Sequence, residues 1–257
     1  GRDDSMKQKI IMRKTGLGLL LSSIFIFGFS LAADAASAKK ELADPSTVKL
    51  EAKVPEDHQE SPMMLNLLMV EAREDMDEVP NEGTIVYLKG QFEMKKHKFK
   101  NLLPRVKIGD FYKVSLKAET QKNLPLDLAG LGPFYLAKVS KDYYLLTPKN
   151  FETIFGDLRD EEEALNYLAE YENLFVSPVV CVVTPETEKG LRKVKRPPPR
   201  SSTVSRSGVD FKAQLIVYSI IQVDGFFEKE VKVTREGTVT ADQEPRLIQK
   251  IGEGVSY

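Results

Sequence analysis

Residues 211–234 read FKAQLIVYSIIQVDGFFEKEVKVT, and apolar residues recur in this stretch at every second position over most of its length. A period of two places successive side chains on opposite faces of a β-strand. Residues 226–234 alternate apolar with polar or charged residues, which is typical of a sheet with one solvated face. Residues 211–223 predict a strand with one mainly apolar face, formed by Phe211, Ala213, Leu215, Val217, Ser219, Ile221 and Val223.

Two turn signals connect these strands to each other and to a further strand near the C-terminus. Asp224-Gly225 predicts a two-residue hairpin turn, because both central positions of the favoured turn need a positive φ. Glu236-Gly237 predicts a second turn, into a short strand over residues 238–241. We therefore expect the C-terminal part of the chain to be an antiparallel meander.

Further strands are predicted upstream, where aromatic and β-branched residues dominate. The last two of them are close enough to form a hairpin around Ser140-Lys141-Asp142, and residues 121–132 predict a surface loop from their proline, asparagine and glycines. The predicted strands cover residues 84–89, 110–118, 134–140 and 142–147.

Cys181, the single cysteine of the chain, lies in another predicted strand, over residues 178–184. One cysteine cannot form an intramolecular disulfide. Its four nearest neighbours are valines, so we expect the thiol to be buried in the sheet. Burial raises the pKa of a thiol and makes it unreactive, which favours a structural role.

Two central helices are predicted from their terminal residues. Thr147 is an N-cap followed by Pro148, and this helix should end near Gly156. Asp160 begins the second helix, in a capping box with Glu163. Its apolar stripe recurs at helical spacing and consists of Ala164, Tyr167, Leu168, Tyr171, Leu174 and Phe175. The order of elements predicts an α+β protein of mainly antiparallel sheet, with both helices packed on one face.

The first 38 residues predict export. We expect translation to begin at Met6, basic residues precede the uncharged apolar stretch 15–33, and Ala36-Ser37-Ala38 offers the small residues that a signal peptidase requires. Residues 6–38 would then be a cleaved signal peptide, which places the protein in the periplasm or outside the cell. The apolar stretch has 19 residues, close to the ~20 that span a bilayer, so an uncleaved membrane anchor is the alternative.

The remainder divides into a predicted flexible tether, residues 39–61, and an α+β domain, residues 62–257. The domain should begin with a helix over 63–76, for which a strand over 65–70 is the competing interpretation. From residue 39 onward the chain has 32 basic and 35 acidic side chains. This balance gives no indication of nucleic-acid binding.

Residues 185–208 lack an apolar period and contain three consecutive prolines, which predicts a long exposed loop. The loop either divides two subdomains or connects strands 178–184 and 211–223 of one sheet. No acidic residue lies between 189 and 206, and a flexible basic segment of this kind favours an anionic partner, with a merely solvated linker as the alternative. The basic residues that we assign to this candidate site are Lys189, Arg192, Lys193, Lys195, Arg196 and Arg200.

The sequence predicts no catalytic residue, cofactor or metal. His58 lies in the tether and His97 in the solvated basic run 95–98, so neither has a positioned partner. Two histidines and one cysteine are too few for a zinc site built from these ligands. The acidic cluster over 71–78 does not have the spacing of an EF-hand.

These features favour an exported, non-catalytic binding protein of the bacterial cell envelope, whose partner is an envelope protein or an anionic surface. Membrane contact would involve only an uncleaved signal or the basic loop. Two alternatives stay open. One is an exported hydrolase that works through carboxylates alone, and the other is a small-molecule carrier with an apolar pocket between the helices and a curved sheet.

Overall fold

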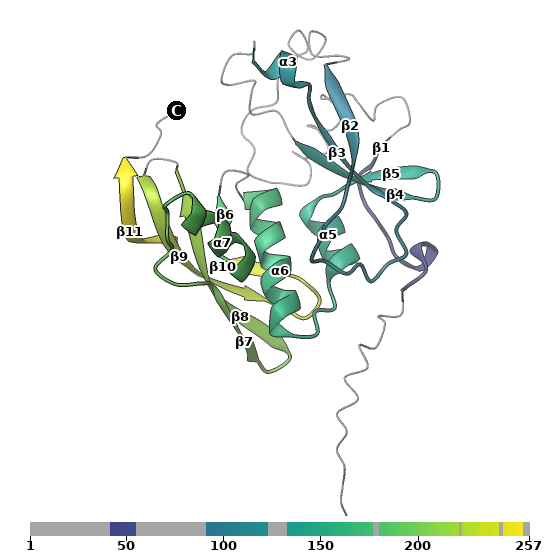
Figure 1. Cartoon of the computed structure of the whole chain (residues 1–257). Coiled ribbons are helices and arrows are strands. Elements are labelled where there is room, and N and C mark those ends of the chain that lie inside the picture. Colours follow the sequence, from purple (N-terminus) through teal and green to yellow (C-terminus); the bar gives the residue numbers. More distant parts are fainter. Residues whose placement is uncertain are drawn as a thin grey trace, which may run out of the picture. The chain divides into compact units, whose positions relative to one another are not determined.

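The computed structural model describes residues 42–54, 91–122, 133–176, 180–220, 223–241 and 244–253 (Figure 1). It confirms an α+β protein whose two sheets are mostly antiparallel. The predicted signal peptide, His58, the helix over 63–76, the strand over 84–89 and most of the loop over 121–132 lie outside the described residues. No helix in the described part of the chain is long and apolar enough to span a bilayer.

The first sheet has five strands in the order β1-β5-β4-β3-β2, and all of its neighbouring strands are antiparallel. Three predicted strands, those over 110–118, 134–140 and 142–147, are confirmed. The sequence pattern missed β2, because the charged run at its end conceals the buried Phe92 at its start. The strands are β1 (Lys53–Val54), β2 (Phe92–His97), β3 (Phe111–Leu116), β4 (Phe134–Val139) and β5 (Asp142–Leu145). A short helix, α3 (Ala118–Gln121), follows β3.

The prediction of a flexible tether is wrong for residues 42–54. Ala43 forms a parallel bridge with Val106, and a 3₁₀-helix, η1 (Pro45–Thr47), begins with Asp44 as its N-cap. β1 then pairs with β5 and buries Val54. The segment has too few apolar residues to show a period, and it is held instead by the backbone bridge to Val106, by backbone pairing with β5 and by the Asn150 side chain, which bonds Glu51.

The two central helices are confirmed as α5 (Pro148–Phe155) and α6 (Glu161–Tyr171), and a π-helical turn, η3 (Glu172–Val176), continues α6. Thr147 and Asp160 are their N-caps, as expected. In the predicted capping box, the Glu163 carboxylate would accept from the backbone N–H of the N-cap, Asp160. It accepts instead from the backbone N–H of Arg159, one residue earlier.

The second sheet is built around β8 (Asp210–Ser219) and β9 (Val223–Val233), which pair over nine residues each. β6 and β7 pair with β8 along one edge, and β10 and β11 pair with β9 along the other. Of the two alternatives left open by the sequence, the pairing of β6 with β8 agrees with the one that places residues 178–184 and 211–223 in one sheet. The outer strands are β6 (Cys181–Val182), β7 (Thr203–Ser207), β10 (Val239–Ala241) and β11 (Arg246–Glu253).

One face of this sheet packs against α5 and α6, as predicted. Phe211, Leu215 and Val233 belong to the same buried cluster as Tyr167 and Leu168 of α6. The Tyr167 hydroxyl also donates to the carbonyl of Gly237 over 2.8 Å. Gly237 has a φ of +105° and forms the predicted turn between β9 and β10.

The predicted turn at Asp224-Gly225 is wrong, because both residues lie inside β9 and Gly225 pairs with Ser219. The φ angle of Gly225 is not positive, so the backbone conformation does not require glycine at this position. A Cβ atom at this position would lie 2.5 Å from the carbonyl oxygen of Gln249, so glycine permits the close approach of β11 across an irregular register. The dipeptide that usually marks a hairpin therefore marks a crowded strand.

The predicted long loop over 185–208 is also wrong, because it contains a helix, α7 (Pro185–Lys193), and strand β7. Thr184 and Thr187 form a capping box at the start of α7. Leu191 is the one buried residue of this helix and packs with Ile216 and Phe226 on the second face of the sheet. The C-terminal sheet is therefore covered by α6 on one face and by α7 on the other (Figure 1).

Candidate anionic-partner site

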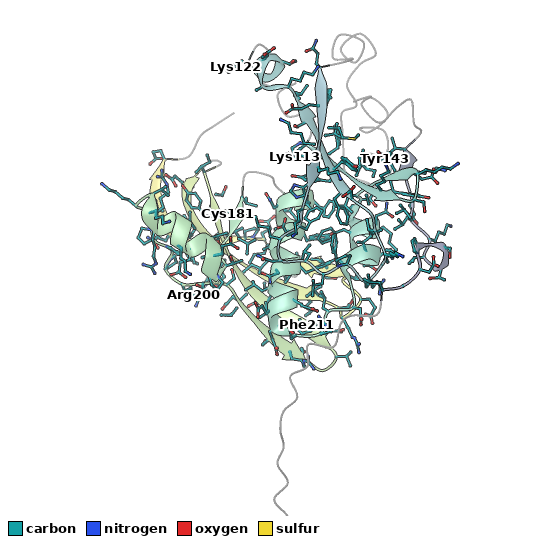
Figure 2. The ribbon with its side chains drawn as sticks, turned by 45° about the vertical axis from the view of Figure 1, so that its right-hand side comes forward. Lys113, Lys122, Tyr143, Cys181, Arg200 and Phe211 are labelled. Atoms are coloured by element: carbon teal, nitrogen blue, oxygen red, sulfur yellow. The ribbon has the colours of Figure 1, made fainter. Side chains whose placement is uncertain are left out.

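The six basic residues of the predicted site lie on α7 and on the segment that connects it to β7. Lys189, Arg192 and Lys193 are exposed on the helix. Lys195 and Arg200 are exposed beyond it, and Arg196 is half-buried. Figure 2 shows Arg200 on the α7 side of the sheet and Phe211 near α6. A folded helix and an ordered return thus replace the predicted flexible loop as the scaffold of these charges.

Arg196 is anchored by a carboxylate on the underlying strand β9. Its Nη2 atom lies 2.8 Å from Oδ2 of Asp224, and the Tyr218 hydroxyl donates to Oδ1 of the same carboxylate over 2.8 Å. The hydrogen bond from Arg196 holds the pKa of Asp224 below its usual value. Burial, followed by the bond to Asp224, raises the pKa of Tyr218. These contacts hold the guanidinium of Arg196 in one place.

Glu228, also on β9, anchors two further arginines. Arg200 donates to its Oε1 atom, and Nη2 of Arg246, from β11, lies 2.6 Å from its Oε2 atom. The Glu228 side chain is only 9% exposed, whereas those of Arg200 and Arg246 are 52% and 75% exposed. The prediction that Glu228 lies on a solvated face is therefore wrong, because Arg200 and Arg246 contact its carboxylate and leave it nearly buried.

The last of the arginines is held within α7 itself. Arg192 pairs with Glu188 over 2.7 Å, and the Ser201 hydroxyl donates to the other oxygen of the same carboxylate. The bond from Ser201, and then that from Arg192, lowers the pKa of Glu188. All three arginines of the predicted site thus have an acidic partner on this face.

The three lysines of the predicted site differ from its arginines. Within the described ranges, no ion pair involves Lys189, Lys193 or Lys195. All three are exposed, and they lie within seven residues on the outer side of α7 and its C-terminus. We call the surface formed by Lys189, Lys193 and Lys195 the lysine surface.

His97 and the possible metal ligands are the next groups to consider. The prediction that His97 is solvated is wrong, because it is half-buried, with its ring 4.6 Å from that of Phe99 and 5.0 Å from that of Tyr135. Burial lowers its pKa. No group of three metal-ligating side chains occurs among the residues that the structure describes.

Cys181 lies in β6, as predicted, but its side chain is half-buried rather than fully enclosed. Burial raises the pKa of the thiol, in the expected direction. Figure 2 shows Cys181 beside the α7 region. A thiol with a raised pKa is a poor nucleophile, so its position favours a structural role.

Comparison of the chain with protein-family models, with curated proteins and with solved structures found no match. Sequence reasoning identified the arginines but missed their partners Asp224, Glu228 and Tyr218. Arg196 and Arg200 each lie 28 residues from the carboxylate that they contact, and no local pattern indicates such a pairing.

Proposed function

We propose that this protein is an exported, non-catalytic binding module of the bacterial cell envelope, and that its lysine surface binds an acidic surface of another envelope protein. Export rests on the N-terminal sequence pattern. The observation that supports the binding site is a difference between the arginines and the lysines on the α7 face. Its arginines pair with carboxylates of the same chain, whereas the three lysines point their charge outward without an ion pair among the described residues.

We choose an acidic protein as the partner because the packing of α7 disfavours insertion of this helix into a lipid surface. Helices that lie in a membrane interface bury a broad apolar face among the lipids. The buried residue of α7, Leu191, instead packs on Ile216 and Phe226, so it contributes nothing to such an insertion. Electrostatic attraction to an acidic protein needs no apolar face and acts mainly on association rate and specificity.

A carboxylate hydrolase receives less support from the buried acidic groups. Asp224 and Glu228 pair with arginines, and Glu172 pairs with Lys229. A general acid needs a carboxyl group whose pKa is raised towards neutrality; the pKa of Asp224 is lowered, and burial raises the pKa of Glu170, on α6, which belongs to none of these pairs. These ion pairs are therefore better explained if the carboxylates stabilise the fold and orient their basic partners.

The test is site-specific photo-crosslinking in the native source, with the photoreactive group placed at Val194, which is exposed between two of the lysines. The group placed at Val209, which is exposed on the β7–β8 turn, is the matched control. We expect a single acidic envelope protein to be captured at Val194 and not at Val209. Capture of phospholipid alone at Val194 would overturn the choice of partner, and capture of nothing would overturn the binding function.

Charge neutralisation then tests the role of the lysines with the captured protein in purified form. The variant K189Q/K193Q/K195Q removes three exposed charges, and K98Q/K100Q/K141Q removes three exposed lysine charges from the region of the first sheet. If each exposed pair contributes about 0.5 kcal/mol, the first variant should bind about tenfold more weakly. Equal affinities of the two variants would contradict the proposal, and unchanged thermal unfolding is the check that both remain folded.

A further inference from the structure

The face of the C-terminal sheet opposite α7 has a cleft of about 280 Å³ that the lysine surface does not use. It lies between η3 and the strands β8 and β9. Val176 and Val180 line one side, and Val217 and Phe227 of the sheet line the other. Two charged residues, Glu172 and Lys229, belong to the same lining. The cleft is therefore mainly apolar, and the polar residues of its described lining are this ion pair and Ser219.

The ion pair is the most deeply buried in the described part of the chain. Lys229 Nζ lies 2.8 Å from Oε1 and 3.0 Å from Oε2 of Glu172, and the two side chains are 9% and 3% exposed. Replacing a buried ion pair with apolar residues of similar volume is often neutral or stabilising. Stability alone therefore does not account for two charges in a mainly apolar cleft.

The pair retains hydrogen-bonding capacity. An ammonium group has three N–H donors, and a carboxylate has about four lone-pair sites. Among the described residues, Lys229 Nζ and the Glu172 carboxylate have hydrogen bonds only to each other. At least one N–H of Lys229 and at least one lone pair of Glu172 thus have no partner among the described residues, and both residues line the cleft.

The charges of the pair sum to zero, which decides the class of ligand. A charged ligand would lose its hydration without gaining a counter-charge, because each member of the pair is already neutralised by the other. An uncharged hydroxyl or amide group can accept from Lys229 and donate to Glu172 at once. The volume corresponds to about ten water molecules at ~30 Å³ each, so it suits a ligand of about ten non-hydrogen atoms.

We propose that this cleft binds a small uncharged molecule with an apolar body and one hydroxyl or amide group. The group bridges Lys229 and Glu172, and the apolar body contacts Val176, Val217 and Phe227. Pockets of this kind, mainly apolar with a few convergent polar groups, are typical of small-molecule sites. This site lies on the opposite face from the lysine surface, so the inference is independent of the proposed protein partner.

The test uses three probes of equal chain length, 1-octanol, octanoate and octylammonium, added to the purified full chain with ¹³C-labelled valine methyl groups. We expect 1-octanol to shift the resonances of Val176 and Val217 in a saturable manner. Octanoate and octylammonium should bind at least tenfold more weakly. Equal affinity for all three probes, or no saturable shift with 1-octanol, would overturn the proposal.

Two variants locate the binding. V176W fills the mouth of the cleft at a position that is 52% exposed, and V209W adds the same side chain at a position that is 74% exposed and does not line the cleft. The 1-octanol shift of Val217 should disappear in V176W and persist in V209W. The double variant E172Q/K229M removes both charges together and should weaken 1-octanol binding several-fold. Shifts that survive V176W would show that the probe binds elsewhere.

Discussion

β9 carries charged side chains on both of its faces, and the ion pairs that they form are buried to different degrees on the two faces. On the α7 face, Asp224 and Glu228 are nearly buried, but their arginine partners are 38% to 75% exposed. On the α6 face, both members of the Lys229–Glu172 pair are at least nine-tenths buried. Solvent screens the first set of charges and not the second. The same strand therefore carries ion pairs of very different sensitivity to mutation.

The largest loss of stability is expected at the Lys229–Glu172 pair, because both of its side chains are buried. Lys229→Met leaves the Glu172 carboxylate buried without a counter-charge, which typically lowers the free energy of unfolding by about 3–5 kcal/mol. Urea unfolding of the variant, monitored by circular dichroism, measures this loss.

The double variant E172Q/K229M separates the cost of an orphaned charge from the value of the pair. With no charge left behind, we expect most of the lost stability to return. If the double variant is as unstable as Lys229→Met, then the pair itself, and not the isolated carboxylate, stabilises this face.

An intermediate loss of stability is expected at Glu228, because two arginines pair with its carboxylate. Arg200→Gln or Arg246→Gln alone should cost at most about 1 kcal/mol, since the partner arginine remains and both side chains are more than half exposed. Together they leave a carboxylate that is 9% exposed without a cation. We expect the double variant to cost about 1–3 kcal/mol more than the sum of the single variants.

A double-mutant cycle by urea unfolding measures this coupling. The pair Arg192→Gln and Arg246→Gln is a matched control, because Arg192 pairs with Glu188 and not with Glu228. The control pair should be additive. Additivity in both cycles would mean that Glu228 does not need either arginine.

The sequence predicted those features whose causes are local. Thr147-Pro148, Asp160 and Glu236-Gly237 act through the backbone groups nearest to them, and each lies at the helix start or turn that it predicted. Thr184-Pro185 carries the same signal as Thr147-Pro148 and begins α7. That signal was available in the sequence, but the prolines and charges after it concealed the helix.

The remaining features depend on contacts between distant residues. Gly225 is explained by the carbonyl of Gln249, on a strand that the pattern did not predict. Arg246 and Glu228 are opposite each other only because β11 pairs with β9. The basic residues of the candidate site could thus be found from composition, whereas the carboxylates that hold its arginines could be found only from the fold.

The smallest of the three effects is expected at Asp224, and it depends on pH. The pKa of this carboxyl is lowered in the folded protein, so its ionised form stabilises the fold above the unfolded value of about 3.9, and this contribution is lost as the pH falls through the lower folded value. Asp224→Asn removes the charge but keeps an acceptor for Tyr218. Urea unfolding at pH 7, 5, 4 and 3 should show that the stability advantage of the unmodified chain over this variant is constant above pH 5 and narrows below pH 4. An advantage that stays constant down to pH 3 would show that Arg196, which is 38% exposed, is too well screened to favour the ionised carboxylate.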